Sequence, residues 1–278
     1  MFVSNDADRD RPHRLLLLCQ SHDGYLLLCR LLSRAYLENQ HRGRAELRRE
    51  WFHEGTAGLI ALSGGHLGDV GCALLAGNAR QARQFAREWT GLFNNRYYIE
   101  VQRAGFADEE HDIQAAVQLA AKLGLPVVAT HPVQFLAADD FKAHEARVCI
   151  SEGYVLNDKR RAKKFTAQQY FKTQAEMAEL FADLPEALQN SVEIARRCNL
   201  SLTLGKPCLP DFPTPGGQGL DDYLRSEAER GLTQRMALLF PDAVERAAKL
   251  PEYQARLAFE TETIIKMGFP GYFLIVAD

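Results

Sequence analysis

The strongest constraint on the fold is an alternation of short apolar runs with longer amphipathic stretches in the first half of the chain. Runs that predict buried strands cover residues 14–19, 58–63, 97–101 and 125–130. Stretches with helical spacing of apolar residues lie between them, at residues 25–36, 73–89 and 110–123. This alternation is typical of βαβ units around a parallel sheet, either open or closed into a barrel.

The predicted strand ends are where chemistry is expected. In folds of this class functional side chains gather where the strands end and the loops begin. We therefore expect residues 63–69, 100–105 and 130–134 to lie together on one rim of the sheet.

The second half of the chain is predicted to be helical. Apolar residues recur with helical spacing at residues 175–181, 184–198 and 220–239. The segment 208–217 contains three prolines and two glycines, which is typical of a domain boundary. We place the boundary so that residues 1–205 and 206–278 form two parts.

Composition excludes several classes of protein. A net charge of −3 provides no overall basic field for gripping nucleic acid. No apolar run reaches the roughly 18 residues that span a membrane. The six cysteines are dispersed without Cys-x-x-Cys spacing, which predicts reduced thiols and a cytoplasmic location.

Seven blocks resemble one family in the same order along the chain. They are LSGGHLGDVG (62–71), YYIE (97–100), VATHPVQF (128–135), FADLPEAL (181–188), EIARRCN (193–199), LPDFP (209–213) and MGFPGYFLIV (267–276). Together they identify the chain as similar to the bacterial replicative DNA polymerases, the alpha subunits of polymerase III, in a proteobacterial form.

The resemblance implies an α/β fold with a PHP domain, which is a distorted (β/α)7 barrel. Residues 1–205 would be this PHP domain, incomplete at its N-terminus. Residues 206–278 would be a linker and a mostly helical start of the polymerase palm. The first strand of the family's barrel, with its His-x-His motif and an early acidic ligand, would lie before Met1.

The same resemblance implies a degenerate metal site. PHP phosphoesterases hold two or three divalent metals with His, Asp, Glu and Cys side chains at the strand ends. The matching positions in this chain are Gly65, Ala104, Pro132 and Gln134. Glycine, alanine and proline offer no side-chain ligand and a glutamine amide is a poor one, so we predict no metal.

Other polar residues near these positions have two interpretations. His66 and His131 lie beside lost positions and could keep a vestigial metal, although rim histidines are more often hydrogen-bonding loop residues. Glu100 could orient a ligand or pair with Arg103 or a backbone donor. Asp69 is predicted to cap a helix. His144 with Glu145 could be a ligand pair, but a structural histidine is favoured.

Two charged segments are also ambiguous. Asp6, Asp8 and Asp10 alternate as metal ligands on a strand can, but a solvated lead-in is favoured. The basic run is either a solvated loop or a contact with nucleic acid or an acidic partner. Its residues are Lys159, Arg160, Arg161, Lys163 and Lys164.

These observations favour a piece of a replicative DNA polymerase that carries no catalytic residues itself. Asp211 is followed by Phe212-Pro213 rather than by the further aspartates of the palm, so we give it no catalytic role. The whole enzyme would use Mg²⁺ in its palm, whereas this piece needs no cofactor. It would brace the palm and, by resemblance, dock the proofreading exonuclease subunit. DNA, the clamp and the clamp loader would be bound by other parts of the enzyme. The alternative is an active metal-dependent PHP phosphoesterase or 3′–5′ exonuclease.

Overall fold

The computed structural model describes residues 1–107, 109–206 and 210–277, and it divides into two compact units. The first unit is Met1–Leu202 and the second is Thr203–Asp278. The predicted boundary after residue 205 lies three residues beyond this division. The first residues of the Pro/Gly-rich segment, 208 and 209, lie outside the described residues.

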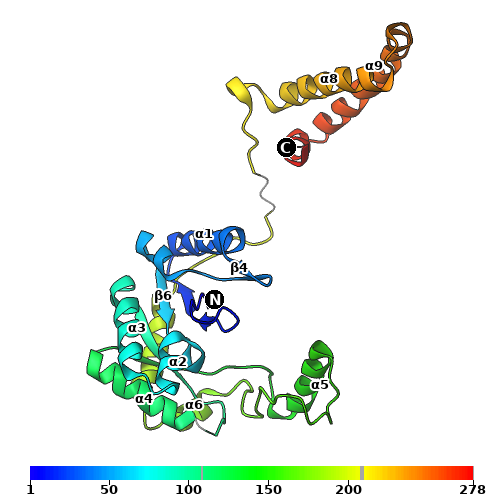
Figure 1. Cartoon of the computed structure of the whole chain (residues 1–278). Coiled ribbons are helices and arrows are strands. Elements are labelled where there is room, and N and C mark those ends of the chain that lie inside the picture. Colours follow the sequence, from blue (N-terminus) through cyan, green and yellow to red (C-terminus); the bar gives the residue numbers. More distant parts are fainter. Residues whose placement is uncertain (108, 207–209, 278) are drawn as a thin grey trace. The chain divides into compact units, whose positions relative to one another are not determined.

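A four-stranded sheet forms the centre of the first unit (Figure 1). Its order is β3 (Leu16–Cys19), β6 (Leu59–Leu62), β7 (Tyr97–Gln102) and β8 (Val127–Thr130). These are the four predicted strands, and β6, β7 and β8 are parallel as expected. The predicted α/β class is confirmed. Among the described residues, however, the sheet is open and does not close into the predicted barrel.

The first strand departs from the prediction, because β3 pairs with β6 in the antiparallel sense. Cys19 at the end of β3 lies opposite Leu59 at the start of β6, so residues 20–58 leave and return at the same end of the sheet. An apolar run does not encode its own direction, which is set by the path of the connection. That path is tight where Gly24 packs on Gly58. A Cβ added at Gly24 would lie 1.9 Å from the Gly58 carbonyl oxygen.

Helices cover the sheet largely where periodicity predicts them. The long predicted helix over residues 73–89 is instead two helices, because the chain turns at Gly77, which has a φ of 71°. Asn78 then caps the second helix by accepting a hydrogen bond from the Gln81 amide. The helices of the first unit are α1 (His22–Glu38), α2 (Asp69–Leu75), α3 (Ala79–Leu92), α4 (Glu109–Leu123), α5 (Phe141–Glu152), α6 (Gln174–Leu180) and α7 (Pro185–Arg197).

Short elements complete the first unit. Two-residue strands form two small antiparallel ladders, one between β1 (Phe2–Val3) and β2 (His13–Arg14), the other between β4 (Gln40–His41) and β5 (Arg44–Ala45). Short 3₁₀ helices are η1 (Arg49–Glu54), η2 (Gly65–Leu67) and η3 (Ala138–Asp140).

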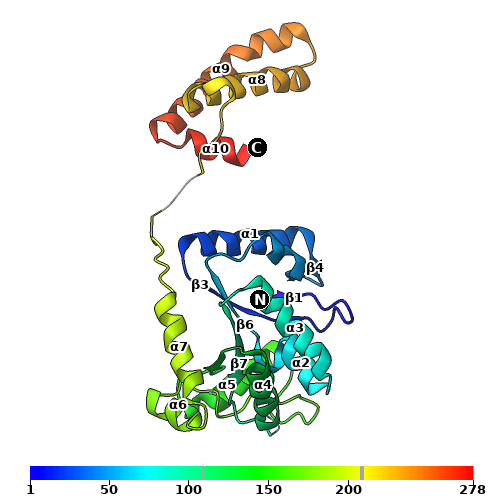
Figure 2. The ribbon, with the colours of Figure 1, turned by 90° about the vertical axis from the view of Figure 1, so that its left-hand side faces the viewer.

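The sheet is apolar on both faces, as the absence of polar alternation predicts. On one face the main core contains large aromatic side chains, with Trp89 packed against Phe52 and Phe93. On the other face Ile60, Leu62, Tyr98 and Val128 pack against Ile194 of α7. Figure 2 shows α7 running alongside the sheet and ending near the start of α1.

The second unit consists of helices. Its elements are η4 (Pro215–Gly217), α8 (Leu220–Leu239), α9 (Ala243–Lys266) and α10 (Pro270–Ala277). Most of the terminal block MGFPGYFLIV lies in α10, in which Pro270 and Leu274 are buried but Phe273 and Val276 are exposed. Among the described residues, no helix combines the length and apolarity needed to cross a lipid bilayer.

Candidate functional site at the strand ends

The ends of β6, β7 and β8 meet in a hydrogen-bonded network. The Glu100 amide donates to Ser63 Oγ at 2.9 Å, which joins the end of β6 to β7. Gln102 Nε2 donates to Glu100 Oε1 at 3.0 Å and to Thr130 Oγ1 at 2.9 Å. Thr130 Oγ1 in turn donates to Glu100 Oε1 at 2.5 Å. The three predicted rim segments therefore begin side by side.

Glu100 is the buried carboxyl group at the centre of this network, with 5% of the residue exposed. Burial raises its pKa, and hydrogen bonds from Thr130, Gln102 and the Gly64 amide oppose the rise. Glu100 is not paired with Arg103, so that alternative of the sequence interpretation is wrong. The carboxyl group is instead held by neutral donors from its own rim.

Replacing Glu100 by glutamine is expected to make stability less dependent on pH. The unfolded chain loses this proton around the ordinary glutamate pKa of about 4.3. Because the pKa of Glu100 is raised in the folded chain, the folded chain keeps the proton to a higher pH. The ionised carboxyl therefore costs stability as pH rises through the folded pKa. The Glu100→Gln chain should gain stability relative to the parent between pH 4 and pH 7.5, by about 1.4 kcal/mol for each unit of the shift.

Urea unfolding at both pH values measures this gain. The control is Thr130→Val, which removes a donor that favours the ionised form and should steepen the parent's pH dependence. A stability difference between Glu100→Gln and parent that is the same at both pH values would contradict the prediction.

The four positions predicted to have lost metal ligands lie in the segments that follow β6, β7 and β8. Gly65 faces the network, since a Cβ added there would lie 3.6 Å from Gln102 Oε1. Ala104 is buried in the next loop, where its amide donates to Glu109 Oε2 at 2.8 Å. Pro132 and Gln134 hold Gln169 instead. The Pro132 carbonyl accepts from Gln169 Nε2 at 3.1 Å, and the Gln134 amide donates to the Gln169 carbonyl at 2.8 Å.

The two candidate vestigial ligands have different surroundings. His131 Nε2 lies 2.9 Å from the Gln168 carbonyl oxygen, and burial lowers the pKa of the ring. His131 Nδ1 is buried and has no hydrogen-bond partner among the described residues. His66 is exposed, with its ring 6.5 Å from that of Phe106.

These donors do not fit a multinuclear metal centre. Within residues 1–107, 109–206 and 210–277, no three His, Cys, Asp or Glu side chains gather as a metal ion requires. The one unpartnered imidazole nitrogen of His131 cannot supply such a site alone. The carboxyl group of Glu100 in this network already accepts hydrogen bonds from Gln102 and Thr130.

Asp69 is a buried ion-pair partner rather than a helix cap. Gly68 is the N-cap of α2 and Asp69 is its first residue. One carboxylate oxygen accepts from the Val70 amide at 2.7 Å. The other accepts from Trp89 Nε1 at 2.7 Å and pairs with Arg49. Asp69 therefore ties η1 and α3 to the start of α2, behind the rim.

Arg103 joins the rim to the helices that follow it. Its guanidinium pairs with Asp183 at 2.6 Å and with Glu110 at 2.7 Å, and it donates to the Leu180 carbonyl at 2.6 Å. It also lies over the Phe181 ring, 5.0 Å from the centroid. The two carboxylates, Asp183 first, raise the pKa of Arg103 and keep it charged.

His144 and Glu145 bind different partners and do not form a ligand pair. The His144 ring packs edge-on against Phe165 with centroids 4.7 Å apart, which supports the structural interpretation. Glu145 forms a buried ion pair with Arg161 at 2.5 Å. Both residues lie on α5, which extends from the body of the first unit (Figure 1).

Much of the basic run is neutralised within the chain. Arg160 pairs with Asp158 at 2.7 Å, Arg161 with Glu145 at 2.5 Å and Lys164 with Glu152 at 2.7 Å. Lys159 and Lys163 are exposed. Contact of this run with nucleic acid or an acidic partner stays a prediction.

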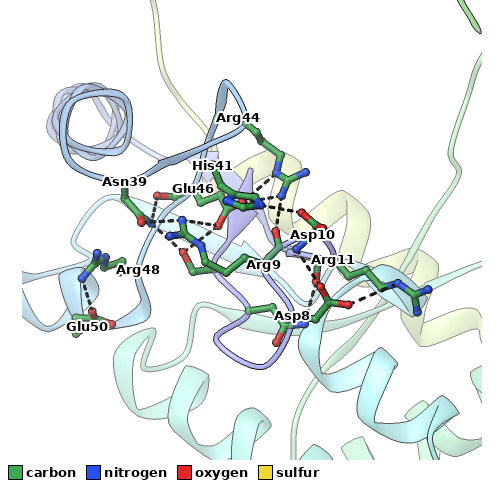
Figure 3. Close-up of polar contacts among 12 residues, drawn as sticks. Asp8, Arg9, Asp10, Arg11, Asn39, His41, Arg44, Glu46, Arg48 and Glu50 are labelled. Carbon is green, nitrogen blue, oxygen red and sulfur yellow. Dashed lines mark hydrogen bonds and ion pairs between the residues drawn. The ribbon is translucent and has the colours of Figure 1, made fainter.

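The N-terminal aspartates also lie among basic partners (Figure 3). Asp8 pairs with Arg11 at 3.7 Å, and Asp10 pairs with His41 at 2.7 Å and Arg42 at 3.1 Å. This agrees with a solvated lead-in. Glu46, a fully buried carboxylate that the sequence did not single out, anchors the segment by accepting a hydrogen bond from Ser4 Oγ at 3.1 Å and by pairing with Arg9 at 3.4 Å.

Comparison with known proteins identifies both parts of the chain. The PHP domain model matches residues 2–104, and the model described as the bacterial DNA polymerase III alpha NTPase domain matches residues 222–278. The DNA polymerase III subunit alpha of Neisseria meningitidis serogroup B is 53% identical over 99% of this chain, which covers 24% of that relative. The chain belongs to the family of bacterial DNA polymerase III alpha subunits.

Other alpha subunits match this chain over nearly its whole length. That of Pseudomonas aeruginosa is 50% identical over 98% of this chain, and that of Escherichia coli K12 is 46% identical over 99%. The chain spans about a quarter of the length of these relatives, 23% and 24% of the two. The predicted proteobacterial alpha-subunit resemblance is confirmed. The PHP match contains the rim residues of β6 and β7, whereas Thr130 and His131 lie beyond it.

Proposed function

We propose that this chain is the PHP and pre-palm part of a replicative DNA polymerase, and that it serves there as a metal-free scaffold. The whole enzyme would extend a primer by template-directed addition of deoxynucleotides, with Mg²⁺ held by palm carboxylates. The chain itself would bind no metal and carry out no step of that reaction.

The observation that carries this proposal is the hydrogen-bonded network at the strand ends. Glu100, Gln102 and Thr130 satisfy one another where a PHP phosphoesterase would present metal ligands. Gly65 beside this network contributes no side chain. Hydrogen bonds that join the ends of β6, β7 and β8 support a role in holding these strands together.

The second unit also supports the proposal that this chain carries out no polymerase chemistry. Asp211 is exposed and is followed by Phe212, which stacks on Tyr223 with ring centroids 5.9 Å apart. A palm needs carboxylates that alternate along one strand so that two face the metals. Residues 210–277 contain no strand in the structure, and so offer no such arrangement.

The proposal includes docking of a separate proofreading exonuclease subunit on the PHP part. Membership of the alpha-subunit family supports this partner. DNA, the clamp and the clamp loader would be bound by other regions of the whole enzyme.

Metal analysis combined with a phosphodiesterase assay tests the scaffold proposal. We expect purified chain, incubated with zinc or manganese and then desalted, to retain far less than one equivalent of metal. Hydrolysis of bis(p-nitrophenyl) phosphate should not exceed the protein-free blank. His131→Ala should leave both results unchanged, as should the exposed control His66→Ala.

The opposite result would support an active PHP phosphoesterase or 3′–5′ exonuclease. In that case the chain would hold stoichiometric metal and hydrolyse the substrate, and His131→Ala would abolish both. The intact polymerase should be assayed in parallel, so that the rim is also tested in its natural context.

A further inference from the structure

The loop after β7 binds a carboxylate group with three consecutive backbone amides. The Ala104 and Phe106 amides donate to Glu109 Oε2, at 2.8 Å and 3.1 Å. The Gly105 amide donates to the other oxygen, Oε1, at 2.9 Å. Gly105 has a φ of 81°, a left-handed turn conformation in which successive N–H groups point to one side. Concave groups of N–H donors of this kind bind anions. We call the three amides of residues 104–106 the amide cradle.

The amide cradle differs from an ordinary helix cap. The start of α6 shows the ordinary form, a capping box in which the Glu176 carboxylate accepts from one backbone amide, that of Thr173 at 2.7 Å. Glu109 is the first residue of α4, and the three amides that donate to it precede this helix. The cradle is therefore an anion-binding feature of the loop itself, and Glu109 supplies the anion.

Contacts that do not involve Glu109 hold the amide cradle in shape. Thr166 Oγ1 donates a hydrogen bond to the Ala104 carbonyl oxygen. Gly105 packs closely on Gln168, since a Cβ added at Gly105 would lie 2.8 Å from Gln168 Cγ. We therefore expect the three amides to keep their positions when the Glu109 carboxylate is removed.

The cradle can be reached from solvent. Gly105 and Phe106 are exposed, and Glu109 is half-buried. A dissolved anion can therefore approach the amides once the Glu109 carboxylate has left them. Glu110 and Asp112 also lie in the first turn of α4, and their charges oppose a second anion. Binding of a free anion to the open cradle should for this reason be weak and should need no more than the three amides.

We propose that the amide cradle is a binding site for a phosphate-type oxyanion and that Glu109 closes it as an internal competitor. The two carboxylate oxygens stand where two phosphate oxygens would accept the same three hydrogen bonds. Because the donors are backbone N–H groups, this site needs no metal, and Ala104 contributes its amide rather than its side chain. Glu109 is tethered three residues beyond the cradle, so it competes at a high effective concentration. A phosphate group near this end of β7 is thus excluded while Glu109 is in place.

Phosphate titration of the 278-residue chain and its Glu109→Ala variant tests the proposal. Inorganic phosphate replaces chloride at constant ionic strength, without added metal, and backbone amide signals are followed by ¹⁵N–¹H NMR. In the variant, the amide signals of residues 104–106 should shift progressively and then saturate. In the parent chain the same signals should stay in place over the same range, because Glu109 occupies these donors.

Urea unfolding provides a second measurement. Phosphate stabilises folded proteins in general because it is excluded from their surface, so the comparison between variants is what counts. Glu109→Ala should show an additional, saturable rise of its urea midpoint with phosphate, as expected for a ligand that binds the folded state. The matched control Glu176→Ala removes a carboxylate that holds a single backbone amide, and should show only the general effect.

A second variant and the opposite outcomes complete the test. Glu109→Gln keeps the length of the side chain but loses its charge, so its response should lie between those of the parent and Glu109→Ala. The proposal is overturned if the signals of residues 104–106 respond equally in the parent and both Glu109 variants, or in none of them. It is also overturned if the largest shifts lie at the exposed Lys159 and Lys163, the result for an adventitious ion only. Such a failure leaves the metal-free scaffold proposal standing, because that proposal is decided by metal retention.

Discussion

Replacing Asp69 by alanine is expected to lower the free energy of unfolding of the first unit by about 3–5 kcal/mol. The Asp69 side chain is 4% exposed and is the acceptor for Trp89 Nε1 and for the Arg49 guanidinium. Its loss leaves the indole N–H without a partner and leaves Arg49 with Glu88 alone. Arg49 also lies over the Phe85 and Trp89 rings, so its charge stays beside apolar side chains with one carboxylate partner fewer.

Urea unfolding followed by tryptophan fluorescence measures this effect. The chain has two tryptophans, Trp51 and Trp89, and both lie in the first unit, so the signal reports that unit alone. Asp69→Asn keeps the shape and an acceptor for Trp89 but loses the charge, and should cost less than alanine. The exposed Asp6→Ala control should stay within about 0.5 kcal/mol of the parent. A cost below about 1 kcal/mol for Asp69→Ala would refute the assigned role.

Replacing Arg103 by methionine is expected to cost about 2–3 kcal/mol. The ion pairs supply little of this, because the Glu110 and Asp183 side chains are 57% and 61% exposed and solvent screens them. The larger part comes from the Leu180 carbonyl, which loses its donor, and from the lost contact with the Phe181 ring. Methionine preserves most of the apolar stem, so the variant isolates the guanidinium.

The matched variant is Arg103→Lys, which keeps the charge but not the planar fork that holds two carboxylates at once. It should lie between the parent and Arg103→Met. Hydrogen exchange should show the loss locally, as faster exchange of the amides of α6, whose last residue is Leu180. Equal stability of the lysine variant and the parent would contradict the role given to the planar guanidinium, because a positive charge alone would then account for the stabilisation.

Much of the fold could be predicted because apolar periodicity reports burial. The runs that became β6, β7 and β8 are largely apolar because both faces of the sheet are covered, and their polar residues Glu100, Gln102 and Thr130 lie at the strand ends. The direction of β3 could not be predicted, because the same residues can pair in either sense. The break between α2 and α3 was missed because apolar spacing continues across it, although Gly77-Asn78 is a turn signal.

The site was predicted in position but not in its contacts. Strand ends indicated the rim, whereas the bond between Gln102 and Thr130 depends on the register of β7 with β8. The pairing of Glu100 with Arg103 was wrong for a simple reason. Glu100 and Gln102 lie two residues apart, so their side chains point to the same face of β7. Arg103 is the next residue after Gln102, and its side chain turns the other way, toward Glu110 of α4 and Leu180 of α6.

The position of α7 has a consequence for synthesis of the protein. Ile60, Leu62 and Tyr98 belong to strands made early, but Ile194, which packs on them, is made almost a hundred residues after Tyr98. That face of the sheet therefore stays open while the ribosome adds residues 99–194. Exposed apolar strand surface attracts other chains and chaperones. The nascent first unit is thus most vulnerable before α7 emerges, and completion of this one helix ends the exposure.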